Sequence, residues 1–128
     1  MTEADLVNFA GVSGDFNPLH TDAEHAAHTL YGQRIAHGAL VLALATGLRQ
    51  RTMLFDGTLL GLLQIRAWRF LKPVAIGDTI GVDVEVTELR ETSNPARALM
   101  TQRLEVHNQR GEVVCDGELV ALLRRRQG

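Results

Sequence analysis

The stretch AHGALVLALATGLRQRTM at residues 36–53 is the most apolar segment of the chain. Its polar residues Arg49, Gln50 and Arg51 gather near its end, where cations suit the dipole of a helix. A helix that is apolar on every face belongs in a protein interior or a bilayer, and this run is far shorter than the roughly 20 apolar residues that span a bilayer. We therefore predict a buried central helix.

The segments after Gly57 have the period of strands. In residues 80–87 isoleucine and valine occupy alternate positions, which is typical of a half-buried strand. Similar segments lie at residues 60–71, 98–106 and 113–123, with Gln102 interrupting the apolar face of one of them. Short turn sequences at 92–95 and 108–111 predict that consecutive strands pair antiparallel as a meander.

The first third of the chain predicts short helices joined by a loop. A helical stripe around Leu6 stops at Gly11 and Gly14. Thr21 and Glu24 have the spacing of a capping box, which predicts that a second helix starts at Thr21 and ends near residue 32. Pro18 is expected to keep the intervening loop free of helix.

One apolar helix followed by an antiparallel sheet with one apolar face has one economical packing, in which the sheet curls around the helix. We expect this α+β hot-dog arrangement as a single domain over residues 1–128. A two-layer α+β sandwich of another topology has the same periodicity and is the alternative.

Composition and charge exclude several classes of function. The chain of 128 residues is 45% hydrophobic and 22% charged, which is too apolar for disorder. Its net charge of −2 gives no global field for nucleic acid or an anionic membrane. Its single cysteine cannot form an internal disulfide, and the acidic start lacks a signal-peptide pattern, so we expect a cytoplasmic protein.

Two segments carry candidate chemistry. In SGDFNPLH at residues 13–20, Asp15 and His20 stand on opposite sides of a turn, from which both can reach one small volume. The alternative is that Asp15 and Asn17 only form the turn. In IAHG at residues 35–38, Gly38 starts the central helix, where a free backbone N–H favours an anion. A glycine required only for packing is equally compatible.

These segments resemble the MaoC-like hydratases and dehydratases of the hot-dog superfamily, typified by (R)-specific enoyl-CoA hydratase. The matching pieces are GDFNPLH at residues 14–20 with Asp22, IAHG at 35–38 and FLKPVAIGD at 70–78. Family members usually carry an extra strand before the segment equivalent to residues 2–5, which bears on the size of the sheet and on the mouth of the site.

The resemblance implies Asp15 and His20 as the catalytic pair, Gly38 N–H as donor to the thioester oxygen, and Asn17 as a supporting residue. It implies (R)-specific hydration of a trans-2-enoyl thioester, or the reverse dehydration. Coenzyme A or acyl carrier protein belongs to the substrate, with no further cofactor and no metal. It also implies a homodimer. The alternatives are a hot-dog thioesterase and a non-catalytic acyl-thioester-binding subunit, and the lack of Asp or Glu in residues 36–54 favours hydration.

Other residues have plain interpretations. We expect His37 to be a packing residue, and His25 and His28 to lie on a solvated helix face. Thr46 is expected to bond a carbonyl of its own helix. Trp68 and Phe70 are predicted to share a strand face with Arg66, lining an acyl tunnel or packing in the core.

Overall fold

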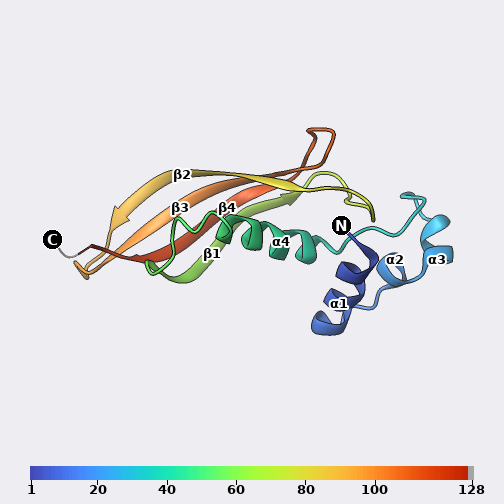
Figure 1. Ribbon diagram of the computed structural model, residues 1–128, viewed down its shortest axis with the longest axis horizontal. Coiled ribbons are helices and arrows are strands. Elements are labelled where there is room, and N and C mark those ends of the chain that lie inside the picture. The colour runs from blue at the N-terminus through green and yellow to red at the C-terminus, as the bar shows by residue number, and fades with distance from the viewer. Residues whose placement is uncertain (127–128) are drawn as a thin grey trace.

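The computed structural model describes residues 1–126 and contains a helical N-terminal part followed by one sheet. The helices are α1 (Glu3–Ser13), α2 (Pro18–Thr21), α3 (Ala23–Ala27) and α4 (Gly38–Gln50), and the strands are β1 (Leu59–Phe70), β2 (Gly81–Glu91), β3 (Arg97–His107) and β4 (Val113–Arg124). Figure 1 shows α4 lying along the long curved sheet, with α1, α2 and α3 beyond one end of it. The predicted sheet curled over a central helix is confirmed.

Helix α4 contributes one face to the core rather than its whole circumference. Leu40, Val41 and Ala45 are buried and belong to the same apolar cluster as Leu104 and Leu119. By contrast, Ala39 and Ala43 on the other side of α4 are exposed. The prediction of a helix buried on every face is therefore wrong for this chain, because the sheet covers only one side of it. No described helix is long and apolar enough to cross a membrane.

The strand order is β1-β4-β3-β2, with every neighbouring pair antiparallel. Strands β2, β3 and β4 form the predicted meander. Strand β1 pairs with β4, so it forms the edge of the sheet opposite β2. The sheet is therefore open at β1 and at β2.

A bulge in β1 reverses the side on which its residues lie. Ala67 has φ 49°, and the register with β4 shifts between Arg66 and Arg69. Trp68 packs against the core, whereas Arg66 pairs with Glu118 at 2.7 Å on the other face. The expectation that Arg66 shares a face with Trp68 is wrong, because the bulge breaks the two-residue period of the strand.

The N-terminal helices begin at residues other than those predicted. Asn17 caps α2 through a bond from Leu19 N to its Oδ1, 2.9 Å, with Pro18 in the first turn. Asp22, not Thr21, caps α3. Proline fits the first position of a helix because that position needs no intrahelical N–H donor. The expectation that Pro18 excludes helix is therefore wrong.

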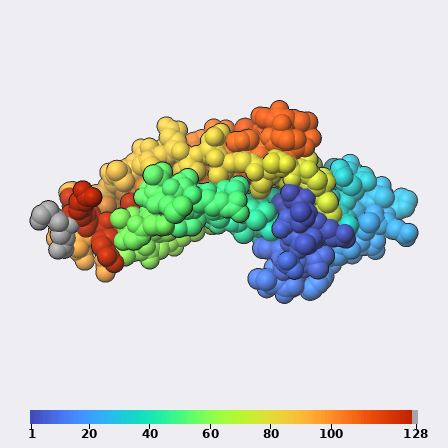
Figure 2. Space-filling model, in the orientation of Figure 1, coloured from blue at the N-terminus to red at the C-terminus, as the bar shows by residue number. Residues whose placement is uncertain are grey.

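The helical part is tied to the sheet through the main chain near residues 36 and 75. Ala36 N donates to Val74 O at 2.7 Å, and Ile35 forms a bridge with Ala75. The amino terminus of Met1 donates to Asp78 O at 2.6 Å. Figure 2 shows that α1 nevertheless projects from the body of the molecule. These few bonds set the position of the loop at residues 14–20.

A substitution at Gly117 tests how tightly the bulged part of β1 packs against β4. A Cβ there would lie 2.6 Å from Trp68 Cε3 and 2.8 Å from Trp68 Cα. We expect Gly117→Ala to lower the free energy of unfolding by about 1–3 kcal/mol, as overpacking does. Gly47→Ala is the matched control, because a Cβ there has no neighbour within 4 Å. It should stabilise helix α4 by about 0.5–1 kcal/mol. Urea unfolding measures both, and equal midpoints for the two variants would contradict the role of Gly117.

Candidate active site

Three chemically active side chains meet where the helical part joins the start of α4. One oxygen of Asp15 and one ring nitrogen each of His20 and His37 all lie within 4.8 Å of one another. Asp15 is exposed, His20 is half-buried and His37 is buried. The fold thus brings together Asp15 and His20, the pair singled out from the sequence, and adds His37 to them.

The position of His20 leaves one ring nitrogen available for chemistry. Its Nδ1 lies 2.7 Å from Ile35 O. A carbonyl oxygen can only accept, so Nδ1 carries the hydrogen and donates it. In the neutral ring Nε2 then has a free lone pair, and no partner for it is found within residues 1–126. This tautomer suits a group that accepts a proton from water or orients it.

His37 packs in the interior, as predicted, and it also contacts the main chain of Asp15 and the ring of His20. Its exposure is only 2%, its Nε2 donates to Asp15 O at 2.9 Å, and its ring stacks on that of His20 at 3.8 Å between centroids. The ring edge also meets Phe9 of α1. Sequence reasoning missed this connecting role, and its only signal was a polar residue directly before Gly38.

The loop that carries Asp15 is shaped by local hydrogen bonds. Gly14 ends α1 with φ 76°, the left-handed conformation that favours glycine. Asp15 Oδ1 then accepts from Asn17 N at 3.2 Å. Asn17 Oδ1 is occupied as the cap of α2, so this oxygen shapes the loop. A contact of Asn17 with substrate stays a prediction.

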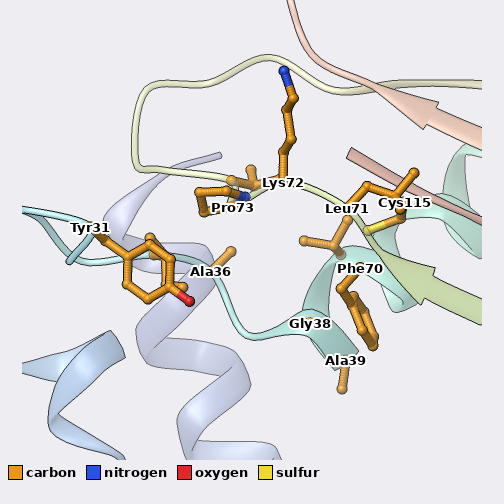
Figure 3. A pocket seen from close by; sticks show the side chains of 12 residues that line it. Tyr31, Ala36, Gly38, Ala39, Phe70, Leu71, Lys72, Pro73 and Cys115 are labelled. Atoms are coloured by element: carbon orange, nitrogen blue, oxygen red, sulfur yellow. The ribbon is translucent and has the colours of Figure 1, made fainter. Parts of the chain in front are cut away.

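Gly38 lies at the edge of a cavity of about 670 Å³ that is lined mostly by apolar residues. Figure 3 shows the Phe70 ring beside Gly38 and Ala39, with Tyr31 further along the pocket. A Cβ on Gly38 would lie 2.7 Å from Phe70 Cε1, so a larger residue at this position would force the exposed Phe70 ring to move. As the first residue of α4, Gly38 has an N–H without an intrahelical acceptor, and it makes no hydrogen bond within residues 1–126.

The other nucleophilic or ligating side chains that the sequence offers are not poised for catalysis. Cys115 lines the cavity, but burial raises the pKa of its thiol to about 11, so it is not a thiolate near neutral pH. Thr46 Oγ1 donates to Ala43 O at 2.7 Å, as predicted. His25 and His28 are exposed on or beside α3, as expected of a solvated face.

The cluster of Asp15, His20 and His37 also has the composition of a metal site, with one carboxylate and two imidazoles. His37 Nε2 and His20 Nδ1 are both engaged with main-chain carbonyls. A metal would therefore use the remaining nitrogens, of which His37 Nδ1 is buried without a partner. The same groups can move protons without a metal, and the absence of a metal stays a prediction.

Comparison with known proteins identifies the family. The family model described as a MaoC like domain matches residues 1–108. An (R)-specific enoyl-CoA hydratase of Aeromonas caviae is 37% identical over 94% of this chain and 84% of its own length. A 3-hydroxybutyryl-CoA dehydratase of Methylorubrum extorquens is 34% identical over 99% of this chain and 76% of its own length.

Solved structures agree with the sequence relatives. The (R)-hydratase from A. caviae involved in PHA biosynthesis superposes with a TM-score of 0.80 at 33% identity, covering 98% of this chain and 89% of that chain. A Mycobacterium tuberculosis protein with a double hot-dog fold has a TM-score of 0.85 at 22% identity, over 100% of this chain and 41% of that one. The second likeness concerns the fold alone. The chain has the hot-dog fold and belongs to the MaoC-like dehydratase family of hydro-lyases.

Proposed function

We propose that this enzyme hydrates trans-2-enoyl thioesters to (R)-3-hydroxyacyl thioesters, or catalyses the reverse dehydration. The observation that carries the proposal is the meeting of Asp15 and His20, with one nitrogen of His20 left free for water. The relatives named above as hydratase and dehydratase support the same reaction type. The thioester of coenzyme A or acyl carrier protein is the substrate, and the proposed reaction needs no further cofactor.

Hydration requires a base that accepts a proton from water and a group that stabilises negative charge on the thioester oxygen. The water oxygen forms a bond to the β-carbon, one water proton passes to a base, and a proton is delivered to the α-carbon. Asp15 and His20 share these transfers, and general acid–base help of this kind is worth about 10²- to 10⁴-fold. Water held between a carboxylate and His20 Nε2 would be oriented by both.

Negative charge develops on the thioester oxygen during attack, and we assign its stabilisation to Gly38. The free N–H of Gly38 and the positive end of α4 favour an anion there. The apolar cavity beside Gly38 would take the acyl chain or part of the thioester. Its lining by Phe70, Leu71 and Val74 suits hydrocarbon.

Hydrolysis and simple binding are distinguished from hydration by one assay. Helix α4 contains no Asp or Glu, the residues on which a hot-dog thioesterase would rely there. Incubation with crotonyl-CoA, followed by enoyl absorbance and by free thiol, tests the three functions together. Loss of absorbance without thiol is expected, thiol release would indicate a thioesterase, and no change would indicate a binding subunit.

We also propose a homodimer formed through β1. Four of its large apolar residues, Leu60, Leu62, Leu63 and Ile65, are 43–58% exposed. Residues 59–65 carry no charge, whereas the other edge strand, β2, is rich in exposed charged residues that oppose edge pairing. The single buried cysteine suits a reducing compartment, and the proposed location is the cytoplasm.

Asp15→Asn should lower kcat for crotonyl-CoA hydration by at least about 10²-fold, because the amide cannot accept the proton from water. The fold should stay intact, since Asp15 is exposed and an amide oxygen can still accept from Asn17 N. Circular dichroism and a steady-state assay of enoyl absorbance check the two statements. Hydration at the wild-type rate would remove Asp15 from the catalytic pair.

His20→Gln should reduce kcat by a similar factor, because it removes the free Nε2. His25→Gln is the matched control, since His25 is exposed outside the cluster, and it should retain the wild-type rate. The rates of the wild type and of both variants are measured before and after treatment with a chelator. Equal losses in the two variants, or loss of wild-type activity on chelation, would point to a structural or metal role instead.

Leu63→Lys should convert the dimer to a monomer, because a buried interface would have to desolvate the ammonium group. Leu89→Lys is the matched control on β2, where Leu89 is 67% exposed. Sedimentation velocity gives the mass of each variant. Dissociation by Leu89→Lys with no effect of Leu63→Lys would assign the interface to the other edge.

A further inference from the structure

A second cavity lies between the C-terminal end of α4 and strands β2 and β3, with a volume of about 250 Å³. Its apolar walls include Phe55, Val82 and Val84, and its polar lining includes Arg49 and Gln102. Arg49 is eleven residues after Gly38, about 16 Å along the helix axis at 1.5 Å per residue. None of the residues in the catalytic cluster lines this cavity.

Arg49 is a buried cation without an acidic partner. The residue is 6% exposed, and within residues 1–126 its guanidinium forms no ion pair or hydrogen bond. Its guanidinium lies over the Phe55 ring, with Cζ 5.9 Å from the ring centroid. Burial accordingly lowers the pKa of Arg49 from its ordinary value. A buried charge without a partner is costly to a fold.

The carboxylate of Asp83 does not neutralise Arg49, although Asp83 also lines the cavity. The Asp83 side chain is 82% exposed, and its Oδ2 lies 3.5 Å from His107 Nδ1. The other acidic residues of β2, Glu85, Glu88 and Glu91, are exposed. The Arg49 guanidinium thus shares the cavity with one carboxylate, that of Asp83, and forms no ion pair with it.

Gln102 adds a second unpartnered group to the same cavity. It is completely buried on the core side of β3, and neither its Nε2 nor its Oε1 has a hydrogen-bond partner. It occupies the position where the apolar alternation of this strand is interrupted. Burying an amide without partners costs about 1–3 kcal/mol for each group, so an apolar residue would stabilise the fold better.

We propose that this cavity binds a carboxylate group. The planar guanidinium of Arg49 matches the two oxygens of a carboxylate, and Gln102 offers one further donor and one acceptor. At about 30 Å³ per water, the cavity corresponds to roughly eight waters, enough for a small organic acid or for the end of a longer chain. The carboxylate comes either from a free acid or from the far end of a substrate acyl chain, and the second source rests on the proposed function.

Glutarate is the probe for binding, measured by isothermal titration calorimetry. The wild-type protein should show saturable binding that Arg49→Met weakens by at least about tenfold, because the charged donor is lost. Arg51→Met is the matched control, since Arg51 is exposed at the end of the same helix. No saturable binding to the wild type, or equal affinity in Arg49→Met, would overturn the proposal.

Stability separates loss of binding from loss of fold. Removing an unpaired buried charge should leave Arg49→Met with a Tm at or above that of the wild type in the absence of glutarate. Gln102→Leu should likewise keep or raise the Tm and weaken glutarate binding. A variant that melts at the wild-type temperature or above, yet binds glutarate normally, would contradict the assigned role of its residue.

Kinetics distinguish the two sources of the carboxylate. The substrates are a trans-2-enoyl-CoA of about 14 carbons, long enough to span the roughly 16 Å from Gly38 to Arg49, and its counterpart with a terminal carboxyl group. If the cavity receives the acyl end, the wild type prefers the carboxylated thioester by about tenfold in kcat/KM, and Arg49→Met loses this preference. Equal kcat/KM values with glutarate binding intact assign the cavity to a free acid. Failure to hydrate either thioester would count against the proposed function alone, because glutarate binding is measured without turnover.

Discussion

The buried imidazole of His37 is the contact on which the arrangement of the candidate active site depends. It binds the main chain of Asp15, stacks on His20 and directly precedes the first residue of the central helix. The helical part also meets the sheet through main-chain bonds near residues 36 and 75 and through Leu6 of α1, which is buried in the core. Because one rigid ring contacts both proposed catalytic residues, their separation is set by packing rather than by the loop alone.

The sheet determines where the helical part lies. Its two edge strands, β1 and β2, each have a neighbouring strand on one side only within the described residues. Edge strand β1 exposes the uncharged, mostly apolar segment 59–65, and the side of α4 that faces away from the sheet is also exposed. In a single chain these apolar surfaces face water, which is unfavourable over so large an area. In the proposed dimer, a second copy of the chain would cover the exposed apolar residues of β1.

Two polar side chains of the core have no hydrogen-bond partner within residues 1–126. Arg49 and Gln102 stand at inward positions where apolar residues would pack, and each lacks a partner within residues 1–126. Natural sequences tolerate such groups mainly where a site needs them. The cavities near Gly38 and near Arg49 lie toward opposite ends of α4, and both are lined mostly by apolar residues.

Much of the architecture could be predicted because it depends on local periodicity. Alternating valines specify strands, short turns specify the β2-β3-β4 meander, and the apolar run specifies α4. The helices around Pro18 were less predictable, because Asn17, Thr21 and Asp22 are all competent caps and only the packed chain selects between them. The chemistry of Asp15 and His20 could be inferred from residue type and from the family resemblance.

The sequence by itself determined the elements, their antiparallel hairpins and the residues able to exchange protons, because these follow from neighbours close in the chain. Tertiary structure decided the rest. It paired β1 with β4, turned Arg66 away from Trp68 through a bulge, and placed His37 between Asp15 and His20. It also placed Arg49 and Gln102, more than fifty positions apart in the sequence, in the lining of one cavity, which no local pattern records.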